Sequence, residues 1–350
     1  MVPVTVDFTK EIGTIKPVNG VGQPPFRGMD FSMIDYLKDA HIPYSRLHDV
    51  GGAFGRNMFV DIPNLFRDFD ADPTKPENYD FAFTDLLITA LVERGVEPIF
   101  RLGVTIENYR TIRAYRIDPP ADYKKWAMIC EHIIRHYTQG WANGFTYPIT
   151  YWEIWNEPDN FEEPEENQMW NGTAEQYYRL YEVASKHLKE KFPHLKIGGY
   201  ASCGFYALTD SGADTANGKC SPRFTYFIDF FDGFLEYIKA NDCPLDFFSW
   251  HSYSGIRENV IWAAYARKRM DESGYQNTEH TLNEWNCRPE LKGTLKHAAL
   301  SGGMLCALQN TSLGSAMFYD ARCNMGIYSG FFDCMTYQPL PTYYSFVAFG

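Results

Sequence analysis

The sequence lacks the patterns that identify several large classes of protein. Its 350 residues contain no run of about 20 apolar residues, the length that a membrane-spanning helix requires. Its eight cysteines include no CxxC pair, which argues against a zinc site and a small disulfide framework. The net charge of −12 repels phosphate backbones, so we expect no nucleic-acid partner, and the lack of a long apolar run leads us to expect no membrane partner.

The N-terminus also lacks the pattern of a secretory leader. The opening stretch, MVPVTVDFTKEIG, contains no basic segment followed by an apolar one. We therefore expect a cytoplasmic protein, with a secreted or periplasmic location as the alternative if a leader has been removed. The oligomeric state stays open.

Aromatic residues, in contrast, are abundant. They make up 17% of the chain, with 8 Trp, 24 Tyr and 26 Phe. Many must belong to the core, but flat apolar rings are also the surfaces on which sugars stack. The composition thus favours a carbohydrate site without identifying one.

Short apolar segments alternate with amphipathic ones along the whole chain. We expect strands at 16–22, 42–49, 96–103, 149–156, 195–201, 245–253, 279–286 and 314–321. Helical spacing of apolar residues appears at 80–95, 121–137, 174–192 and 227–242. Eight strand–helix repeats predict a parallel sheet that closes into a (β/α)8 TIM barrel.

A doubly wound sheet is the alternative fold. No GxGxxG follows the first expected strand, where two prolines interrupt the stretch GVGQPPFRG. We therefore assign residues 16–350 to the catalytic barrel. Residues 1–15 are interpreted as an N-terminal strand, a candidate remnant of an accessory β-sandwich.

Two glutamates lie at the ends of expected strands. Glu157 follows the fourth strand and Glu284 ends the seventh, so a closed barrel places them on opposite sides of its mouth. Paired carboxylates are what glycoside hydrolysis requires. We expect Trp152, Trp155 and Pro158 to desolvate Glu157, which would raise its pKa and favour a general acid.

The other strand ends carry candidates for supporting roles. His251 and Tyr253 can hydrogen-bond the charged form of Glu284, and Asn156 can donate to a sugar hydroxyl. Arg46 is interpreted as a buried partner that holds Glu284. Further candidates for substrate binding are His48, Trp285, Phe318 and Tyr319.

Each of these residues also has a plainer interpretation. A single glutamate at a strand end is more often ion-paired or exposed than catalytic, and a histidine such as His48 can simply be a satisfied buried residue. A metal-dependent hydrolase would need an HxH pair after the first strand, where the sequence reads VNGVGQ. We expect no metal and no organic cofactor.

The order of the motifs resembles a known family. EIWNEP resembles the acid/base signature of clan A glycoside hydrolases. The stretches PPADYKKWAMICEHIIRHYTQGW, EQYYRLYEVASKHLKEKFPHLKIGGYA, PLDFFSWHSYS and PTYYSF resemble family 39, which contains β-xylosidases and α-L-iduronidases. The resemblance covers roughly residues 16–349.

This resemblance implies a role for each matching residue. Glu157 would be the acid/base and Glu284, in TLNEWN, the nucleophile of a retaining enzyme that forms a covalent glycosyl intermediate. Carboxyl groups about 5–5.5 Å apart would accord with retention. Asn156, His251 and Tyr253 match family positions near the sugar bound at the cleavage point, and His48 matches a histidine on the second strand.

The sequence departs from the family at the eighth strand. Family xylosidases have a tryptophan there and an acidic pair just after it, whereas this chain reads SAMFYDARCNMG. We rank an exo-acting β-xylosidase on plant or microbial oligosaccharides first, an arabinosidase or galactosidase second and an iduronidase third. Arg101, Arg288 and Arg322 are available for a uronate carboxylate. A carbohydrate-binding barrel without hydrolytic activity is the competing class.

Overall fold

Eight parallel strands close into one barrel in the order of the sequence. The computed structural model describes residues 5, 7, 9–11, 13–28, 30–50, 60–105, 117–209 and 220–350. The first strand pairs with both the second and the eighth, which closes the barrel. The strands are β1 (Gly20–Gly22), β2 (Tyr44–Leu47), β3 (Glu97–Leu102), β4 (Tyr151–Ile154), β5 (Lys196–Ser202), β6 (Phe247–Ser252), β7 (Glu279–Trp285) and β8 (Ser315–Tyr319). The predicted (β/α)8 barrel is confirmed.

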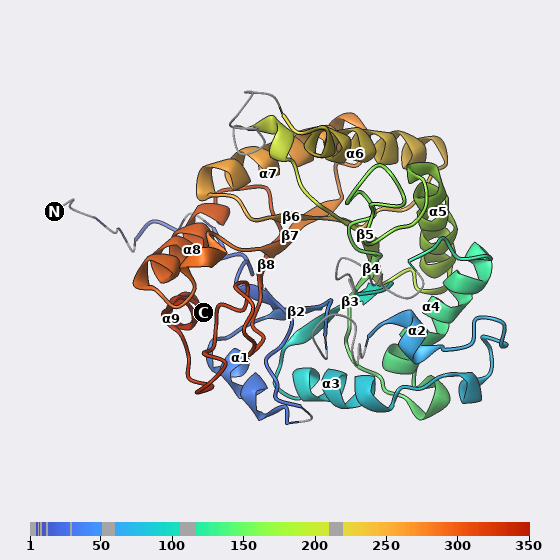
Figure 1. Ribbon diagram of the computed structural model, residues 1–350, viewed down its shortest axis with the longest axis horizontal. Coiled ribbons are helices and arrows are strands. Elements are labelled where there is room, and N and C mark those ends of the chain that lie inside the picture. The colour runs from blue at the N-terminus through green and yellow to red at the C-terminus, as the bar shows by residue number, and fades with distance from the viewer. Residues whose placement is uncertain are drawn as a thin grey trace.

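Helices form a ring outside the strands (Figure 1). The α-helices are α1 (Asp35–Asp39), α2 (Ile62–Leu65), α3 (Ala82–Val92), α4 (Tyr123–Gln139), α5 (Ala174–Lys191), α6 (Pro222–Ala240), α7 (Ile256–Glu272), α8 (Leu295–Leu308) and α9 (Pro341–Phe349). Short 3-10 helices lie at Ser32–Ile34, Pro76–Asn78, Trp141–Asn143, Tyr206–Leu208 and Pro289–Leu291. All four predicted helices are present.

Local sequence signals account for several helix ends. Asp122 accepts hydrogen bonds from the backbone N–H groups of Lys124 and Lys125, and thereby begins α4. Thr173 and Gln176 form a reciprocal capping box at the start of α5. Gly95 has a φ of 74°, the left-handed conformation that lets the chain leave α3 for β3.

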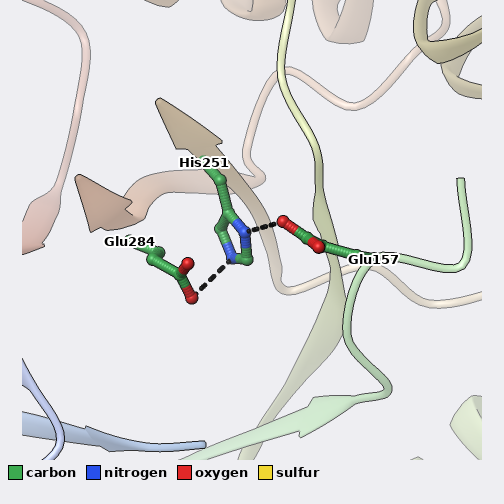
Figure 2. Close-up of side chains that lie close together, drawn as sticks. All are labelled: Glu157, His251 and Glu284. Atoms are coloured by element: carbon green, nitrogen blue, oxygen red, sulfur yellow. Dashed lines mark hydrogen bonds and ion pairs between the residues drawn. The ribbon is translucent and has the colours of Figure 1, made fainter. Parts of the chain in front are cut away.

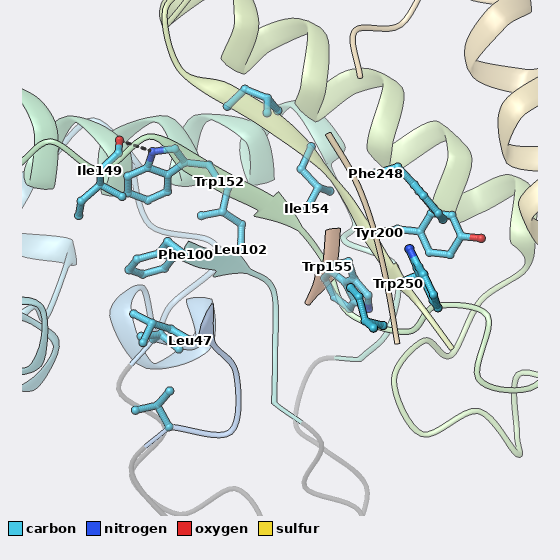
Figure 3. Packing of buried hydrophobic residues seen from close by; sticks show 14 of the residues in the cluster. Leu47, Phe100, Leu102, Ile149, Trp152, Ile154, Trp155, Tyr200, Phe248 and Trp250 are labelled. Atoms are coloured by element: carbon cyan, nitrogen blue, oxygen red, sulfur yellow. Dashed lines mark hydrogen bonds between the residues drawn. The ribbon is translucent and has the colours of Figure 1, made fainter. Parts of the chain in front are cut away.

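Strand alternation separates an apolar outer face from a polar interior. Phe100 and Trp152 stack with centroids 5.1 Å apart on the face turned to the helices, and Tyr200, Phe248 and Trp250 pack on the same face (Figure 3). The opposite face carries polar side chains near the C-terminal ends of the strands. The barrel therefore holds its polar groups where active sites of this fold are built.

Three features of the chain can be compared with the sequence: its N-terminal segment, the hydrophobicity of its helices and its cysteines. Most of residues 1–15 lie outside the described part, and the described ones among them form no strand, so the accessory sheet stays a prediction. Within the described ranges, no helix has the length and hydrophobicity needed to span a membrane. All eight cysteines are free thiols.

Candidate active site

A buried arginine joins the strands at the centre of the barrel. Arg46 on β2 is 1% exposed, and its guanidinium lies 2.7 Å from Oε2 of Glu153 on β4 and 3.1 Å from Oε2 of Glu284 on β7. Its Nη2 also donates to the side-chain oxygen of Asn156 at 2.6 Å. A planar guanidinium with several donors can hold three partners at once, so it fixes Glu284 relative to the loop after β4.

Glu284 receives hydrogen bonds from two sides. Arg46 donates to Oε2, and the Tyr253 hydroxyl, just beyond β6, donates to Oε1. Both donors favour the ionised carboxylate. The side chain is 8% exposed, so the carboxylate is largely buried.

Glu157 lies across the mouth, with His251 between the two carboxylates (Figure 2). Nδ1 of His251 is 2.8 Å from Oε1 of Glu157, and its Nε2 is 3.8 Å from Oε2 of Glu284. Asn160 donates to the other oxygen of Glu157 at 2.9 Å. One oxygen of each glutamate and one nitrogen of His251 all lie within 4.8 Å of one another.

The three groups shift one another's pKa values. Burial raises the pKa of Glu157, but the hydrogen bond and charge of His251 outweigh it and leave this pKa below its usual value. Burial raises the pKa of Glu284, and the charge of Glu157 adds to this rise, against the attraction of His251 and Arg46. Burial lowers the pKa of His251, but the two glutamates outweigh it, so the net shift is upward.

The expected role of the tryptophans near Glu157 is wrong. Trp152 stacks on Phe100 on the helix side of the sheet, and the Trp155 indole donates to the carbonyl of Met169 at 2.8 Å. The predicted rise in the pKa of Glu157 is also wrong, because hydrogen bonding by His251 outweighs the effect of burial and lowers this pKa.

Two aromatic candidates for substrate binding are also wrong. Trp285 and Phe318 are both fully buried, and each packs against Phe346 of α9 on the outside of the barrel. Neighbouring residues of a strand point to opposite faces, so Trp285 turns away where Glu284 faces the mouth, and Phe318 turns away where Tyr319 faces it.

The remaining candidates lie at or near the mouth. Asn156, Tyr253 and Tyr319 contact Arg46, Glu284 and Asp49, respectively. His48 is 3% exposed with Nε2 3.3 Å from Asp49, and burial holds its pKa well below the usual value.

The three arginines considered for a uronate each have a carboxylate partner. Arg101 pairs with Asp61 and Arg322 with Asp320, whereas Arg288 pairs with Glu290 on the exposed surface. These pairs reduce the positive charge available to an acidic sugar.

Sequence reasoning missed three buried polar residues in this region. Glu153 is fully buried and accepts hydrogen bonds from Ser249 and Asn283 as well as from Arg46. Asn160 and Asp49 were not predicted to act at the site. The signal available for Glu153 was a charge in the middle of an otherwise apolar strand, which must have a partner when buried.

A shift in strand pairing brings two adjacent residues of β7 to the barrel interior. Trp250 of β6 pairs with Leu282, whereas the next residue, His251, pairs with Glu284, which leaves Asn283 without its own partner in the register. Asn283 reaches Glu153 and Glu284 reaches Arg46. This irregularity allows both to take part in one network.

Glu157, His251 and Glu284 are close enough to be ligands of one metal ion. The Arg46 guanidinium, however, already brings a positive charge to Glu284. Arg46 already occupies one oxygen of Glu284 and would repel a divalent cation, which argues against a metal at these three side chains.

A closed barrel with two carboxylates across its C-terminal mouth is the arrangement typical of glycoside hydrolases. Residues 55–281 match the model of the glycosyl hydrolases family 39, and the chain belongs to this family. The resemblance noted in the sequence is thus confirmed.

Two curated relatives are named β-xylosidases. The one from Geobacillus stearothermophilus is 24% identical over 211 residues, which cover 57% of this chain and 36% of that protein. The one from Caldicellulosiruptor saccharolyticus is 26% identical over 184 residues, which cover 50% and 31%. The chain spans about a third of the length of these relatives.

Solved structures support the fold. A glucosidase from Croceicoccus marinus has a TM-score of 0.74 at 24% identity, with 97% of this chain and 68% of that chain covered. A family 39 β-xylosidase from Caulobacter crescentus has a TM-score of 0.64 at 16% identity, with 97% and 71% covered.

Proposed function

We propose that the chain is a retaining glycosidase that removes single sugars from the end of oligosaccharides, with β-xylosides as its substrates. The observation that carries this proposal is the spacing of Glu157 and Glu284, whose nearer oxygens are within 4.8 Å. Retaining enzymes need carboxyl groups about 5–5.5 Å apart, and inverting enzymes need about 6.5–9.5 Å to admit a water molecule. The named activity of the two curated relatives supports the choice of sugar.

Glu284 is the nucleophile in this proposal. Arg46 and Tyr253 donate to both of its oxygens and hold it as an anion aimed at the mouth. Its carboxylate attacks the anomeric carbon as the bond to the leaving oxygen breaks. A covalent glycosyl ester on Glu284 results.

Glu157 is the acid and then the base. His251 lies within hydrogen-bonding distance of Glu157, so one proton can move from its Nδ1 to the carboxylate without rearrangement. Glu157 gives this proton to the leaving oxygen, and afterwards takes one from the water that attacks the anomeric carbon. The Glu284 carboxylate leaves, and the sugar keeps its original configuration.

The first test is a screen of aryl glycosides with the product anomer followed by NMR. We expect a β-xyloside to be hydrolysed with the β-anomer released first. An α-anomer as the first product would contradict the retaining mechanism.

Variants of the two glutamates test their roles. Glu284→Ala should lower kcat by about 10⁴-fold or more, because no covalent intermediate can form. Glu157→Ala should slow substrates with poor leaving groups far more than activated aryl glycosides, and added azide should restore turnover with a retained glycosyl azide as product.

The exposed Glu290→Ala and Glu162→Ala serve as matched controls and should retain wild-type turnover. Unchanged turnover of Glu284→Ala, or equal slowing of both substrate types by Glu157→Ala, would contradict the assigned roles.

A further inference from the structure

A third carboxylate, Asp49, is held at the barrel mouth by its surroundings. It lies two residues beyond β2, and its φ of 51° falls in the left-handed region, which costs a residue with a Cβ about 1 kcal/mol or more. Its N–H donates to Oγ1 of Thr105 at 3.2 Å, and its Oδ2 accepts a hydrogen bond from the Tyr319 hydroxyl at 2.8 Å. These contacts keep the carboxylate in place despite an unfavourable backbone.

Asp49 belongs to the same site as the paired glutamates. The rings of Tyr319 and Tyr253 have centroids 6.3 Å apart, and Tyr253 donates to Glu284. The Asp49 side chain is 10% exposed, similar to the 8% of Glu284. A sugar that lies against Glu284 would therefore meet Asp49 as well.

Within the described ranges, the Asp49 carboxylate forms no ion pair with an arginine or lysine. Arg101 and Arg322 both act on it electrostatically, but each pairs with another carboxylate, Asp61 or Asp320. His48 lies 3.3 Å away, and burial together with the charges of nearby arginines lowers its pKa and keeps it neutral. Burial raises the pKa of Asp49 to about 6, so above that pH a bound molecule at this position meets a negatively charged hydrogen-bond acceptor.

We propose that Asp49 determines which sugar is accepted at the cleavage point: it binds hydroxyl groups of a neutral sugar and rejects sugars that carry a carboxylate. This inference rests on the proposed glycosidase function and adds the substrate class to it. A hydroxyl can donate to the carboxylate, whereas a uronate would place a second negative charge beside it in a poorly solvated site. A site that has such an acceptor discriminates strongly, because the wrong ligand leaves it without a partner.

Two substitutions remove the charge and are compatible with the backbone. Asp49→Asn preserves the size and the oxygen that accepts from Tyr319, and asparagine tolerates a positive φ. Asp49→Gly relieves the strain altogether, so it should fold even if the asparagine variant does not. Tyr319→Phe is a graded comparison: it leaves the negative charge and the N–H contact to Thr105 but removes one contact that holds Asp49, so the discrimination should change less than in the Asp49 variants.

The ratio of kcat/KM for an aryl β-xyloside to that for the corresponding aryl β-glucuronide measures the discrimination. We expect both Asp49 variants to lower this ratio by about tenfold or more, mainly through KM, and Tyr319→Phe to keep it within about threefold. An unchanged ratio in both Asp49 variants, or an equal fall in Tyr319→Phe, would overturn the proposal.

Binding of free xylose and free glucuronate, followed by ligand-observed NMR, separates this inference from the proposed function. Wild-type protein should bind xylose more strongly, and Asp49→Asn should reduce the preference even if no glycoside is hydrolysed. Failure of turnover with an intact preference would contradict only the proposed function. Equal binding of both sugars by the wild type would contradict the role of Asp49.

Discussion

Glu157 receives one hydrogen bond on each carboxylate oxygen, and these two contacts help to set its protonation state. His251 and Asn160 contact different oxygens of this group, and both contacts favour its ionised form. The free protein therefore holds the mobile proton largely on the histidine. When the leaving oxygen of a substrate is protonated, the proton moves from His251 to Glu157 and from Glu157 to that oxygen.

The role of Asn160 leads to a prediction about pH dependence. Asn160→Ala removes a donor to the charged form, so the pKa of Glu157 should rise. The proton that Glu157 shares with His251 should then be kept to higher pH, and the basic limb of the kcat/KM profile, which reports loss of this proton, should move with it. The maximal kcat/KM should fall by roughly ten- to 100-fold, since a hydrogen bond to a charged group contributes about 1.5–3 kcal/mol. Initial rates on an aryl xyloside with a poor leaving group, over about pH 4 to 9, measure both effects.

Tyr253→Phe tests the acid limb of the same kcat/KM profile. It removes the hydroxyl donor to Glu284, whose pKa should rise further, and the acid limb should then move to higher pH. Asn241→Ala, at the end of α6, should move neither limb. A shift of the same limb in both site variants would argue against separate roles for the two glutamates.

At the scale of secondary-structure elements, the residues at or just beyond the end of a strand carry the active-site side chains, and hydrogen bonds from the next loop or helix help to fix their positions. The loop between β4 and α5 contains Glu157 and Asn160, and Arg223 of α6 donates to the carbonyl of Asn160 at 2.7 Å. Asn167 accepts hydrogen bonds from the N–H groups of Met169 and Trp170 and so shapes the rest of this loop. The position of the acid therefore depends on hydrogen bonds well beyond its own strand.

The capping box at the start of α5 has a measurable effect on stability. Thr173→Ala should lower the free energy of unfolding by about 1 kcal/mol, because one N-terminal N–H loses its acceptor. Adding Gln176→Ala should cost less than the sum of the single changes, since the two residues share the box. Urea unfolding followed by circular dichroism measures these differences.

Thr294→Ala, at the start of α8, removes a cap without a reciprocal partner and should cost less than Thr173→Ala. All these variants should retain wild-type kcat/KM. A loss of stability that is fully additive in the double variant would contradict the shared box.

At the scale of the whole molecule, one buried network ties opposite sides of the barrel together. Arg46, Glu153 and Glu284 come from β2, β4 and β7, and Ser249 adds β6. Removing one partner from such a pair leaves an uncompensated buried charge, which is more costly than the pair itself. The network thus positions the site and connects β2, β4, β6 and β7 across the barrel interior.

Buried neutral histidines make the stability of the molecule depend on pH. His280 is 1% exposed, and burial lowers its pKa to about 3. The unfolded chain binds a proton below about pH 6.5 that the folded protein excludes, so stability falls from about pH 6.5 towards pH 3. His280→Gln should reduce this slope by up to about 1.4 kcal/mol per pH unit.

Urea midpoints at several values between about pH 4 and 7 measure the slope. His297, whose pKa burial lowers to about 4, should account for part of the slope that remains. The exposed His194→Gln is the matched control and should leave the slope unchanged. Equal slopes for His280→Gln and the wild type would contradict the assignment.

The pattern of apolar residues was sufficient to predict the barrel architecture and the location of Glu157 and Glu284 at its mouth. Each predicted strand segment contains a strand, and Glu157 and Glu284 face one mouth because parallel strands of a closed barrel end on the same side. Such information is local: periodicity identifies the elements, and capping residues identify their ends.

Only the tertiary structure decided which neighbours complete the site. The shifted register of β6 and β7 turns both Asn283 and Glu284 inward, and strand alternation then sends Trp285 outward. A positive φ places Asp49 at the mouth. Register shifts and backbone strain arise from contacts between segments distant in sequence, so periodicity along one strand does not reveal them.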